Sequence, residues 1–250
     1  MKYMGSKSRI AKHISPIIQK YIDSNRVEKY LEPFVGGANM IDKIKCKSKV
    51  GSDLNRFLIA LLNRVKDGGE LLEEVPRELY NEVRSHQYDN TYEDWFVGNV
   101  GFLASYNGRW FDGGYAQSGY EKTKTGERYR DYYQESKNNL LKQVENIRDC
   151  KFYNMSYIEW DSMNGLENLV IYCDPPYQGT KKYANATKFD YDLFWETMRK
   201  WSKHNIVLIS EQNAPDDFEC IWEQEVSRSI KATDKSKSTE KLFKYKGKEE

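Results

Sequence analysis

Short apolar segments alternate with segments of helical periodicity along this chain, and this alternation constrains the fold more than any other feature. The first block predicts helices over residues 9–22, 37–45 and 56–75, the last with a break near Gly68, and strands over residues 29–37 and 48–55. The second block predicts strands over residues 150–157, 168–177, 205–212, 220–226 and 240–246, and a helix over residues 191–204. Strands separated by helices predict an α/β fold with a mostly parallel sheet covered on both faces. Ligands are then expected at the carboxyl ends of the strands.

The segment between the two blocks has a different composition. It is polar, aromatic and turn-rich, with few β-branched residues that could fill a core. We interpret residues 67–148 as an insertion in a sheet domain formed by residues 1–66 and 149–250.

Composition excludes several classes of protein. A chain of 250 residues with 39% hydrophobic residues is long enough to bury a sizeable core. Its 39 Lys and Arg nearly cancel its 38 Asp and Glu, so a polyanion would have to bind a local basic patch. The four cysteines form no CxxC pair and the three histidines are scattered, which indicates neither a disulfide framework nor a metal site.

Membrane and secretion signals are not apparent. The first ten residues, MKYMGSKSRI, contain no apolar core of a signal peptide, and no stretch approaches the ~20 apolar residues of a membrane span. We therefore expect a soluble, cytoplasmic protein.

Two strand ends in the first block carry features of a nucleotide site. Glycines in the turn after the first strand, Gly36 and Gly37, permit positive φ and close approach of a ligand. Asp53 ends the next strand, where a carboxylate can accept both hydroxyls of a ribose. A tight turn without a ligand, and an aspartate that only caps the following helix, are the alternatives.

The most apolar strand ends in Asp174-Pro175-Pro176-Tyr177. The two prolines hold the backbone extended and donate no hydrogen bond, so hydrogen-bond acceptors remain. The carboxylate of Asp174 and the carbonyl of Pro175 could accept both hydrogens of an exocyclic amine, and Tyr177 offers a face on which a heterocycle can stack. The alternative is an Asp-Pro turn with Tyr177 in the core.

With these segments, the chain resembles the S-adenosylmethionine-dependent DNA adenine N6-methyltransferases of the α arrangement. Their Asp-Pro-Pro-Tyr motif is similar to residues 174–177, their Phe-x-Gly turn to Phe34–Gly36, and their Tyr-x-Gly-x-Lys motif to Tyr3–Lys7. The order of cofactor parts, insertion and catalytic motif is also that of the family. The resemblance implies a Rossmann-like, mostly parallel sheet with an inserted target-recognition subdomain.

Two positions depart from the family pattern. Ala38 stands where the last glycine of the turn is usual, and its methyl group restricts approach to the backbone. The insertion has Asp112-Gly113-Gly114-Tyr115 where better-known members have Asn-x-Pro-Tyr-Gly, so their sequence specificity cannot be transferred.

The resemblance assigns roles to the motif residues. It implies methyl transfer from S-adenosylmethionine to the N6 amine of a flipped-out adenine, without a metal. Catalytic roles fall on Asp174, Pro175, Pro176 and Tyr177. Cofactor-binding roles fall on Tyr3, Lys7, Phe34, Gly36, Asp53 and Asp174.

The same resemblance makes duplex DNA the partner of the insertion and allows for a cognate restriction endonuclease. Asn107-Gly108 is typical of a hairpin turn, with Arg109 able to reach a base or phosphate and Trp110 able to wedge or stack. The residues expected to bind DNA are Tyr106, Asn107, Arg109, Trp110, Lys122, Arg128 and Arg130, and Lys124 is a further basic residue there. A solvated surface role for the basic residues, and packing for Trp110, are the alternatives.

Other functions use the same acceptor cluster. N-methyltransferases acting on cytosine N4, RNA or a protein amide are the nearest, although those families tend to begin the motif with Ser or Asn rather than Asp. A DNA-binding relative without activity is the alternative from another class.

Overall fold

The computed structural model describes residues 1–123, 126–163, 166–177, 189–231 and 234–247. The chain forms two compact units. Unit 1 consists of Met1–Lys12, Val35–Ile44 and Val50–Asn154, and unit 2 of His13–Phe34, Lys45–Lys49 and Met155–Glu250.

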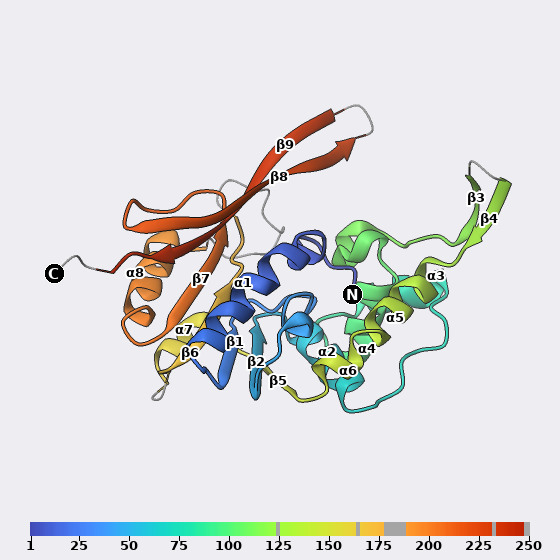
Figure 1. The fold of residues 1–250 in the computed structure, drawn as a ribbon. Coiled ribbons are helices and arrows are strands. Elements are labelled where there is room, and N and C mark those ends of the chain that lie inside the picture. Colours follow the sequence, from blue (N-terminus) through green and yellow to red (C-terminus); the bar gives the residue numbers. More distant parts are fainter. Residues whose placement is uncertain (124–125, 164–165, 178–188, 232–233, 248–250) are drawn as a thin grey trace. The chain divides into compact units, whose positions relative to one another are not determined.

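Unit 2 contains a parallel core of three strands and a long antiparallel ribbon (Figure 1). Its elements are α1 (Ala11–Ser24, entering at His13), β1 (Lys29–Glu32), α7 (Tyr157–Asp161), β6 (Leu169–Cys173), α8 (Tyr191–Trp201), β7 (Ile206–Glu211), β8 (Phe218–Lys231) and β9 (Asp234–Tyr245). β6 pairs in parallel with β1 and β7, and β9 pairs antiparallel with β7 and β8.

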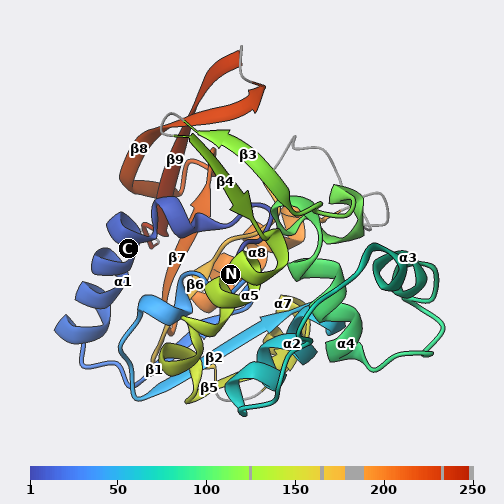
Figure 2. The same cartoon turned by 90° about the vertical axis from the view of Figure 1, so that its right-hand side faces the viewer.

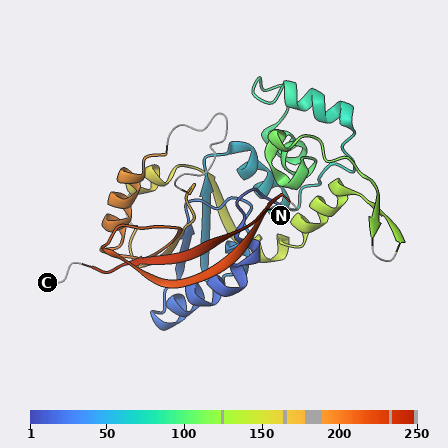
Figure 3. The same cartoon turned by 90° about the horizontal axis from the view of Figure 1, so that it is seen from above.

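Burial explains the sequence of β6. All five of its residues are buried, and Val170 pairs with Tyr30 on one side and Ile206 on the other. A central parallel strand covered on both faces needs a continuous apolar run rather than an alternating one, and LVIYC is such a run. Helix α8 lies beside this sheet (Figure 3) and buries Phe194, Trp195 and Met198.

Unit 1 is mainly helical and carries a separate two-stranded hairpin (Figure 2). Its helices are α2 (Arg56–Lys66), α3 (Arg77–Ser85), α4 (Asp94–Gly98), α5 (Tyr132–Leu141) and α6 (Val144–Ile147), with a π-helical turn η3 (Asn99–Leu103) and the 3-10 turns η1 (Lys7–Arg9), η2 (Ile41–Lys43), η4 (Tyr106–Gly108) and η5 (Trp110–Gly113). Its strands are β2 (Ser48–Asp53, entering at Val50), β3 (Gly119–Thr123), β4 (Gly126–Arg130) and β5 (Cys150–Asn154).

The seven strands of the main sheet follow the order β5-β2-β1-β6-β7-β9-β8. The sheet is mixed and mostly parallel, with helices between its strands along the chain, which confirms the predicted α/β, Rossmann-like fold class.

Two predicted helices are wrong in extent. Of the helix expected over residues 37–45, only the turn η2 forms. Gly36 and Ala38 have φ of 47° and 56°, which a right-handed helix does not allow. The Ala38 carbonyl instead accepts a hydrogen bond from Gln143 Nε2 at 3.1 Å. The one expected over residues 56–75 ends at Lys66, because Gly68 has φ of 79° and terminates it.

The chain's last two strands are longer than the predicted 220–226 and 240–246. The added residues are polar and lack the alternation of apolar residues from which a strand is recognised in sequence. Antiparallel pairing between β8 and β9 makes both strands longer than the sequence indicates.

The predicted insertion, residues 67–148, lies within unit 1. Helix α2, which precedes it in sequence, packs against α4 and α6 inside it. The boundaries of an inserted domain therefore stay a prediction. In the part of the chain that the structure describes, no helix is both long enough and apolar enough to cross a bilayer.

Packing of α4 against α2 predicts a specific decrease in stability. A Cβ added at Gly98 would lie 2.3 Å from the Phe57 carbonyl oxygen, so Gly98→Ala should lower the free energy of unfolding by about 1–3 kcal/mol despite alanine's better helix propensity. Gly119→Ala is the matched control, since a Cβ there meets no atom within 4 Å. Urea unfolding of both variants measures the difference, and equal midpoints would contradict the packing argument.

Candidate functional site

In unit 1, Asp53 joins the glycine turn to the end of β2. Its Oδ2 accepts a hydrogen bond from the Gly36 amide at 3.2 Å, and its Oδ1 accepts one from the Asn55 amide at 2.9 Å. The Val35 amide also donates to the Ser52 carbonyl at 2.9 Å. The two strand ends that the sequence indicates as a nucleotide site are thus tied together.

Asp53 does not cap the following helix. The N-cap of α2 is Asn55, whose Oδ1 accepts from the Leu58 amide at 3.1 Å. Burial raises the pKa of Asp53, and hydrogen bonds from Asn55 and Gly36 act against that rise. Each carboxylate oxygen can accept a second hydrogen bond, so Asp53 retains acceptor capacity for a hydroxyl pair.

Tyr3 packs against the glycine turn. A Cβ added at Gly36 would lie 3.0 Å from Tyr3 Cε1, and one added at Gly37 would lie 2.8 Å from Tyr3 Cβ. The Tyr3 ring also meets Phe102, with centroids 5.7 Å apart. A side chain at either turn position would press on the tyrosine, so the N-terminal motif and the turn pack as one structure.

Lys7 begins a short turn directly after the Tyr3–Ser6 segment. The Ser6 amide bonds to the Tyr3 carbonyl at 3.1 Å, and Gly5 between them has φ of 77°. Ser6 Oγ then caps η1 by accepting from the Ser8 amide at 3.2 Å. The glycine of the Tyr-x-Gly-x-Lys segment is therefore required by a left-handed backbone position that places Lys7 one turn after Tyr3.

Ala38 occupies a position suited to glycine. Its φ of 56° lies in the left-handed region, and its side chain is fully buried. An L-residue costs roughly 1–2 kcal/mol in that region, so the substitution places strain in the turn while Gly36 and Gly37 keep the close contacts.

In unit 2, the Asp-Pro-Pro-Tyr segment directly follows β6. Asp174 is half-buried, Pro175 is buried, and Pro176 is exposed. Tyr191 Oη donates to the Pro176 carbonyl at 2.7 Å. The Asp174 carboxylate and the Pro175 carbonyl as the pair that binds an amine stay a prediction.

Tyr177 is held by an acid from β9. Its hydroxyl donates to Glu240 Oε2 at 2.6 Å. Burial raises the pKa of Tyr177 well above its ordinary value, and the nearby charges of Asp174 and Glu240 raise it further. The phenol therefore stays protonated, and its bond to Glu240 fixes the orientation of the ring.

Phe34 belongs to an aromatic cluster in the same unit. Its ring lies 5.3 Å from that of Tyr157 and 6.0 Å from those of Phe189 and Phe194. Sequence reasoning missed Tyr157, although Phe189 and Phe194 fall in the segment FDYDLFW that follows the catalytic motif. Phe34 lies in unit 2 and Gly36 in unit 1.

Two buried carboxylates at strand ends of unit 2 were also missed. Glu32 ends β1 and Glu211 ends β7, and they are 2% and 3% exposed. Tyr30 Oη donates to Glu32 at 2.6 Å, and burial followed by the charges of Asp174 and Glu32 raises the pKa of Cys173. An acid as the last residue of an apolar strand is the signal that could have found both.

The motif residues of the predicted site are divided between the two units. Tyr3, Lys7, Gly36 and Asp53 lie in unit 1, and Phe34, Asp174, Pro175, Pro176 and Tyr177 lie in unit 2. A shared pocket flanked by Asp53 and Asp174 stays a prediction.

Three of the basic residues expected to bind DNA, Lys122, Arg128 and Arg130, lie on the β3–β4 hairpin. Lys122 and Arg128 are exposed, and the Arg128 guanidinium lies 4.0 Å from Glu121. Tyr120 and Tyr129 face each other across the strands, are 77% and 54% exposed, and have ring centroids 5.3 Å apart. Exposed aromatic rings beside basic side chains are typical of a nucleic-acid-binding surface. Lys124 lies outside the described residues.

Asn107-Gly108 does not form the tight β-hairpin that we predicted. Both residues have positive φ, as the dipeptide favours, but they form a 3-10 turn. A single antiparallel bridge between Ser105 and Tyr115 closes the surrounding loop. Tyr106, 48% exposed, and Arg109 are presented outward.

Trp110 packs inside unit 1. Its ring lies 5.2 Å from Phe57 and 4.5 Å from Phe102, and its Nε1 donates to Gln87 Oε1 at 3.1 Å. These contacts support the packing alternative, and a wedge role for Trp110 would require the indole to leave them.

Arg130 is engaged within the protein. Its Nε lies 2.7 Å from Glu135 Oε2, its Nη2 lies 3.2 Å from Glu135 Oε1, and its Nε lies 3.5 Å from Glu121. Glu135 Oε1 also lies 2.8 Å from Lys2 Nζ. Hydrogen bonds from Arg130 and then Lys2 lower the pKa of Glu135 to about 2.

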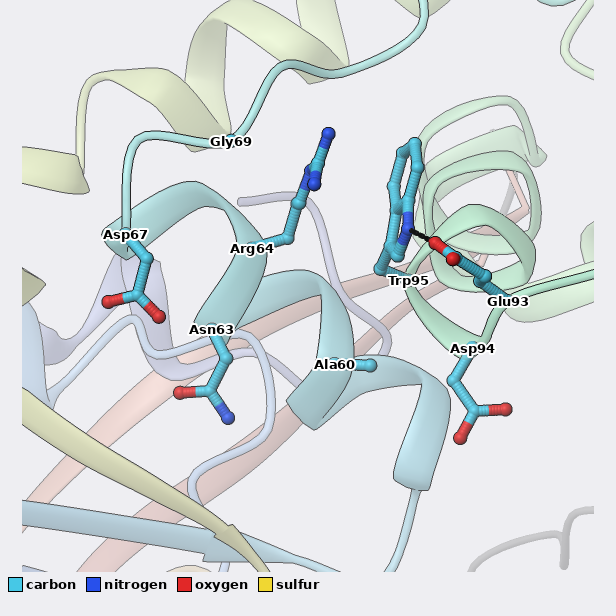
Figure 4. A pocket seen from close by; sticks show the side chains of 8 residues that line it. All are labelled: Ala60, Asn63, Arg64, Asp67, Gly69, Glu93, Asp94 and Trp95. Carbon is cyan, nitrogen blue, oxygen red and sulfur yellow. Dashed lines mark hydrogen bonds between the residues drawn. The ribbon is translucent and has the colours of Figure 1, made fainter.

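A pocket of about 400 Å³ between α2 and α4 contains none of these residues (Figure 4). The Arg64 guanidinium lies 4.3 Å from the Trp95 ring and donates to the Glu70 carbonyl, while Trp95 Nε1 donates to Glu93. The groups that a ligand would use in this pocket are therefore engaged by the protein itself, and the pocket is not the candidate site.

Comparison with known proteins identifies the family of the chain. The D12 class N6 adenine-specific DNA methyltransferase family matches residues 3–212, and the chain belongs to this family. The match includes all the motif residues described above and excludes β8 and β9. A family description specific to adenine N6 favours that target over cytosine N4, RNA or a protein amide.

Curated relatives carry matching names. The chain is 25% identical over 226 residues to Type II methyltransferase M.MjaIII of Methanocaldococcus jannaschii, covering 77% of this chain and 74% of that protein. It is 30% identical over 176 residues to a DNA adenine methylase of Salmonella typhi, covering 66% of this chain and 61% of that protein. A DNA adenine methylase of Salmonella typhimurium matches with the same identity and coverage.

The lowered pKa of Glu135 predicts an acid-dependent contribution to stability. Since its folded pKa lies below its unfolded value of about 4.3, the ion pairs stabilise the fold fully above that pH and cease to do so as the pH falls towards 2. Glu135→Gln should therefore unfold more easily than the wild type at pH 7, with the gap closing between about pH 4.5 and 2.

Urea unfolding at several pH values measures this gap. Glu145→Gln, which changes an exposed carboxylate on α6, is the control for the removal of one negative charge. A gap between Glu135→Gln and the wild type that stayed constant down to the lowest pH would contradict the assignment.

Proposed function

We propose that this chain is a site-specific DNA adenine N6-methyltransferase that uses S-adenosylmethionine and acts on a flipped-out adenine. The observation that carries the proposal is the Asp174-Pro175 acceptor pair at the end of a fully buried parallel strand, within a chain of the D12 adenine-specific family.

The acceptor pair explains how the amine would be activated. The lone pair of adenine N6 is delocalised into the ring, and it becomes nucleophilic as the nitrogen turns tetrahedral. Asp174 and the Pro175 carbonyl would accept hydrogen bonds from the two N–H groups of that nitrogen. These hydrogen bonds would be stronger in the transition state than in the ground state. Tyr191 already donates to the Pro176 carbonyl, so we assign the amine to the Asp174–Pro175 pair rather than to Pro176.

Tyr177 would supply the stacking surface for the base. Adenine inside a duplex cannot reach Asp174, so it must leave the stack at a cost of a few kcal/mol. A phenol ring already oriented by Glu240 offers a fixed face on which the base regains part of that energy.

Residues of unit 1 fit the cofactor's polar groups. The Gly36–Gly37 turn admits close backbone approach, Asp53 has acceptor capacity for the ribose hydroxyls, and Lys7 would contact the cofactor's carboxylate side. When bound, S-adenosylmethionine supplies a methyl group already activated on sulfonium. The chain then mainly aligns the amine with this methyl group, and such alignment contributes up to ~7–11 kcal/mol.

DNA would be bound by the exposed side chains of unit 1. Lys122 and Arg128 on the hairpin and Arg109 in the η4–η5 loop would contact phosphates or base edges, with Tyr106 and Asn107 in the same loop as Arg109. Arg130, whose guanidinium already binds Glu135, would support the hairpin from within the protein. A cognate restriction endonuclease stays a prediction of the resemblance.

The catalytic role of Asp174 predicts a selective decrease in activity. Asp174→Ala should lower the rate of methyl transfer from labelled S-adenosylmethionine to duplex DNA by ~100-fold or more, because one acceptor of the transition state is removed. Asp216→Asn, which changes an exposed acid in the same unit, should retain the rate.

Sequencing of the wild-type product for N6-methyladenine would identify the recognised site. Methylation by Asp174→Ala at the wild-type rate would exclude the assigned mechanism. Transfer to RNA but not to DNA would exclude the assigned substrate.

The hairpin predicts a change in salt dependence. Lys122→Gln and Arg128→Gln should each weaken DNA binding and reduce the slope of log K against log salt by ~0.9 for each phosphate that the variant no longer binds. Lys20→Gln, which replaces an exposed lysine of α1, removes the same charge and should leave the slope unchanged. Fluorescence anisotropy across a salt series gives the slopes, and equal slopes for all variants would remove the hairpin from the interface.

A further inference from the structure

Glu135 on α5 joins two segments that the proposed function uses separately. It binds Arg130, at the end of the hairpin, at distances of 2.7 and 3.2 Å, and it binds Lys2, in the N-terminal segment, at 2.8 Å. The side chains of Lys2, Arg130 and Glu135 are 23%, 27% and 33% exposed. We call Lys2, Arg130, Tyr132 and Glu135 the Glu135 junction.

Tyr132 forms the floor of this junction. The Arg130 guanidinium lies 4.3 Å and the Lys2 ammonium 5.7 Å from the centre of its ring. Two cations that would otherwise repel each other are thus held by one carboxylate and one aromatic face. Each partner restricts the freedom of the others, because the Glu135 oxygens serve both cations.

One arm of the junction leads to the surface proposed for DNA. Arg130 pairs with Gly119 at the base of the hairpin, and Lys122 and Arg128 lie further along the same two strands. A ligand that holds the hairpin would therefore also restrict Arg130.

The other arm leads to the turn proposed for the cofactor. Lys2 directly precedes Tyr3, whose ring and Cβ lie against Gly36 and Gly37 as closely as glycine permits. The loop at Gly108 also packs tightly against the Lys2 backbone, because a Cβ added at Gly108 would lie 2.3 Å from the Lys2 carbonyl oxygen. Ordering of Lys2 would thus restrict the residue that packs against the cofactor turn.

We propose that Glu135 is a positioning residue that couples DNA binding at the β3–β4 hairpin to cofactor binding at the Gly36–Gly37 turn. The inference rests on the proposed function, because it takes those two ligands from it. Because Glu135 ties the two segments together, a ligand that orders one segment also restricts the other, so the second ligand bears a smaller entropic cost and binds more tightly. By thermodynamic linkage, DNA must tighten cofactor binding by the same factor by which the cofactor tightens DNA binding.

The test is calorimetry of S-adenosylhomocysteine, the unreactive product of the cofactor, with and without saturating duplex that carries the methylated site. The ratio of the two dissociation constants is the coupling factor. We expect a factor of about 5 or more in the wild type, as for ordinary allosteric pairs. In Glu135→Gln we expect it to fall below about 2, with the dissociation constant in the absence of DNA almost unchanged.

Glu121→Gln is the matched control. Glu121 also lies close to the guanidinium groups of Arg128 and Arg130, but it belongs to the hairpin itself and does not join it to the N-terminal segment. It should therefore retain the wild-type coupling factor. Lys2→Gln removes the other end of the junction and should abolish coupling as Glu135→Gln does, while the double variant should have no larger effect than either single variant.

A wild-type coupling factor of one would overturn the inference, and so would an unchanged factor in both Glu135→Gln and Lys2→Gln. Weakening of S-adenosylhomocysteine binding in these variants by the same amount with and without DNA would also overturn it, because it would show a purely structural role. Methyl transfer by the wild type separates these results from failure of the proposed function. A wild type that methylates DNA without coupling overturns only the inference, and one that methylates no DNA overturns the function.

Discussion

The burial of β6 between β1 and β7 is the constraint on which unit 2 and its Asp-Pro-Pro-Tyr segment depend. A buried polar backbone group needs a hydrogen-bond partner. A strand covered on both faces must therefore end where the neighbouring strands no longer pair with it. Pro175 and Pro176 end it by removing two donors directly after Asp174. This places the Asp174 carboxylate and the Pro175 carbonyl at the edge of a rigid core, where the proposed reaction would need little reorganisation.

A second constraint acts on the glycine turn of unit 1. Asp53 accepts from both the Gly36 and Asn55 amides, so one side chain holds the glycine turn to the end of β2. Tyr3 occupies the space that a Cβ on Gly36 or Gly37 would take, which makes the N-terminal segment part of the turn. Ala38 tolerates a left-handed φ in this setting because its methyl group is fully buried and the surrounding bonds over-determine the backbone.

Local sequence signals predicted the elements whose cores they fill. The apolar run of β6 and the periodicity of α2 and α8 were sufficient, and Asp53 ends its strand and Asp174 directly follows its strand as expected. Prediction failed where side chains from distant segments override local preference. Gln143 binds the Ala38 carbonyl and helps to keep residues 37–45 from forming a helix, and Asn107-Gly108 turns within a loop closed by Ser105 and Tyr115.

The sequence by itself determined the fold class, the family and the motif residues, because strand periodicity, glycine turns and the Asp-Pro-Pro-Tyr segment depend on residues close together in the chain. Only the tertiary structure decided how individual side chains are used. It placed Trp110 in an aromatic core, bound Tyr177 to Glu240, and bound Arg130 and Lys2 to Glu135. Tyr177 and Glu240 lie 63 positions apart, and no local pattern encodes a contact that folding alone creates.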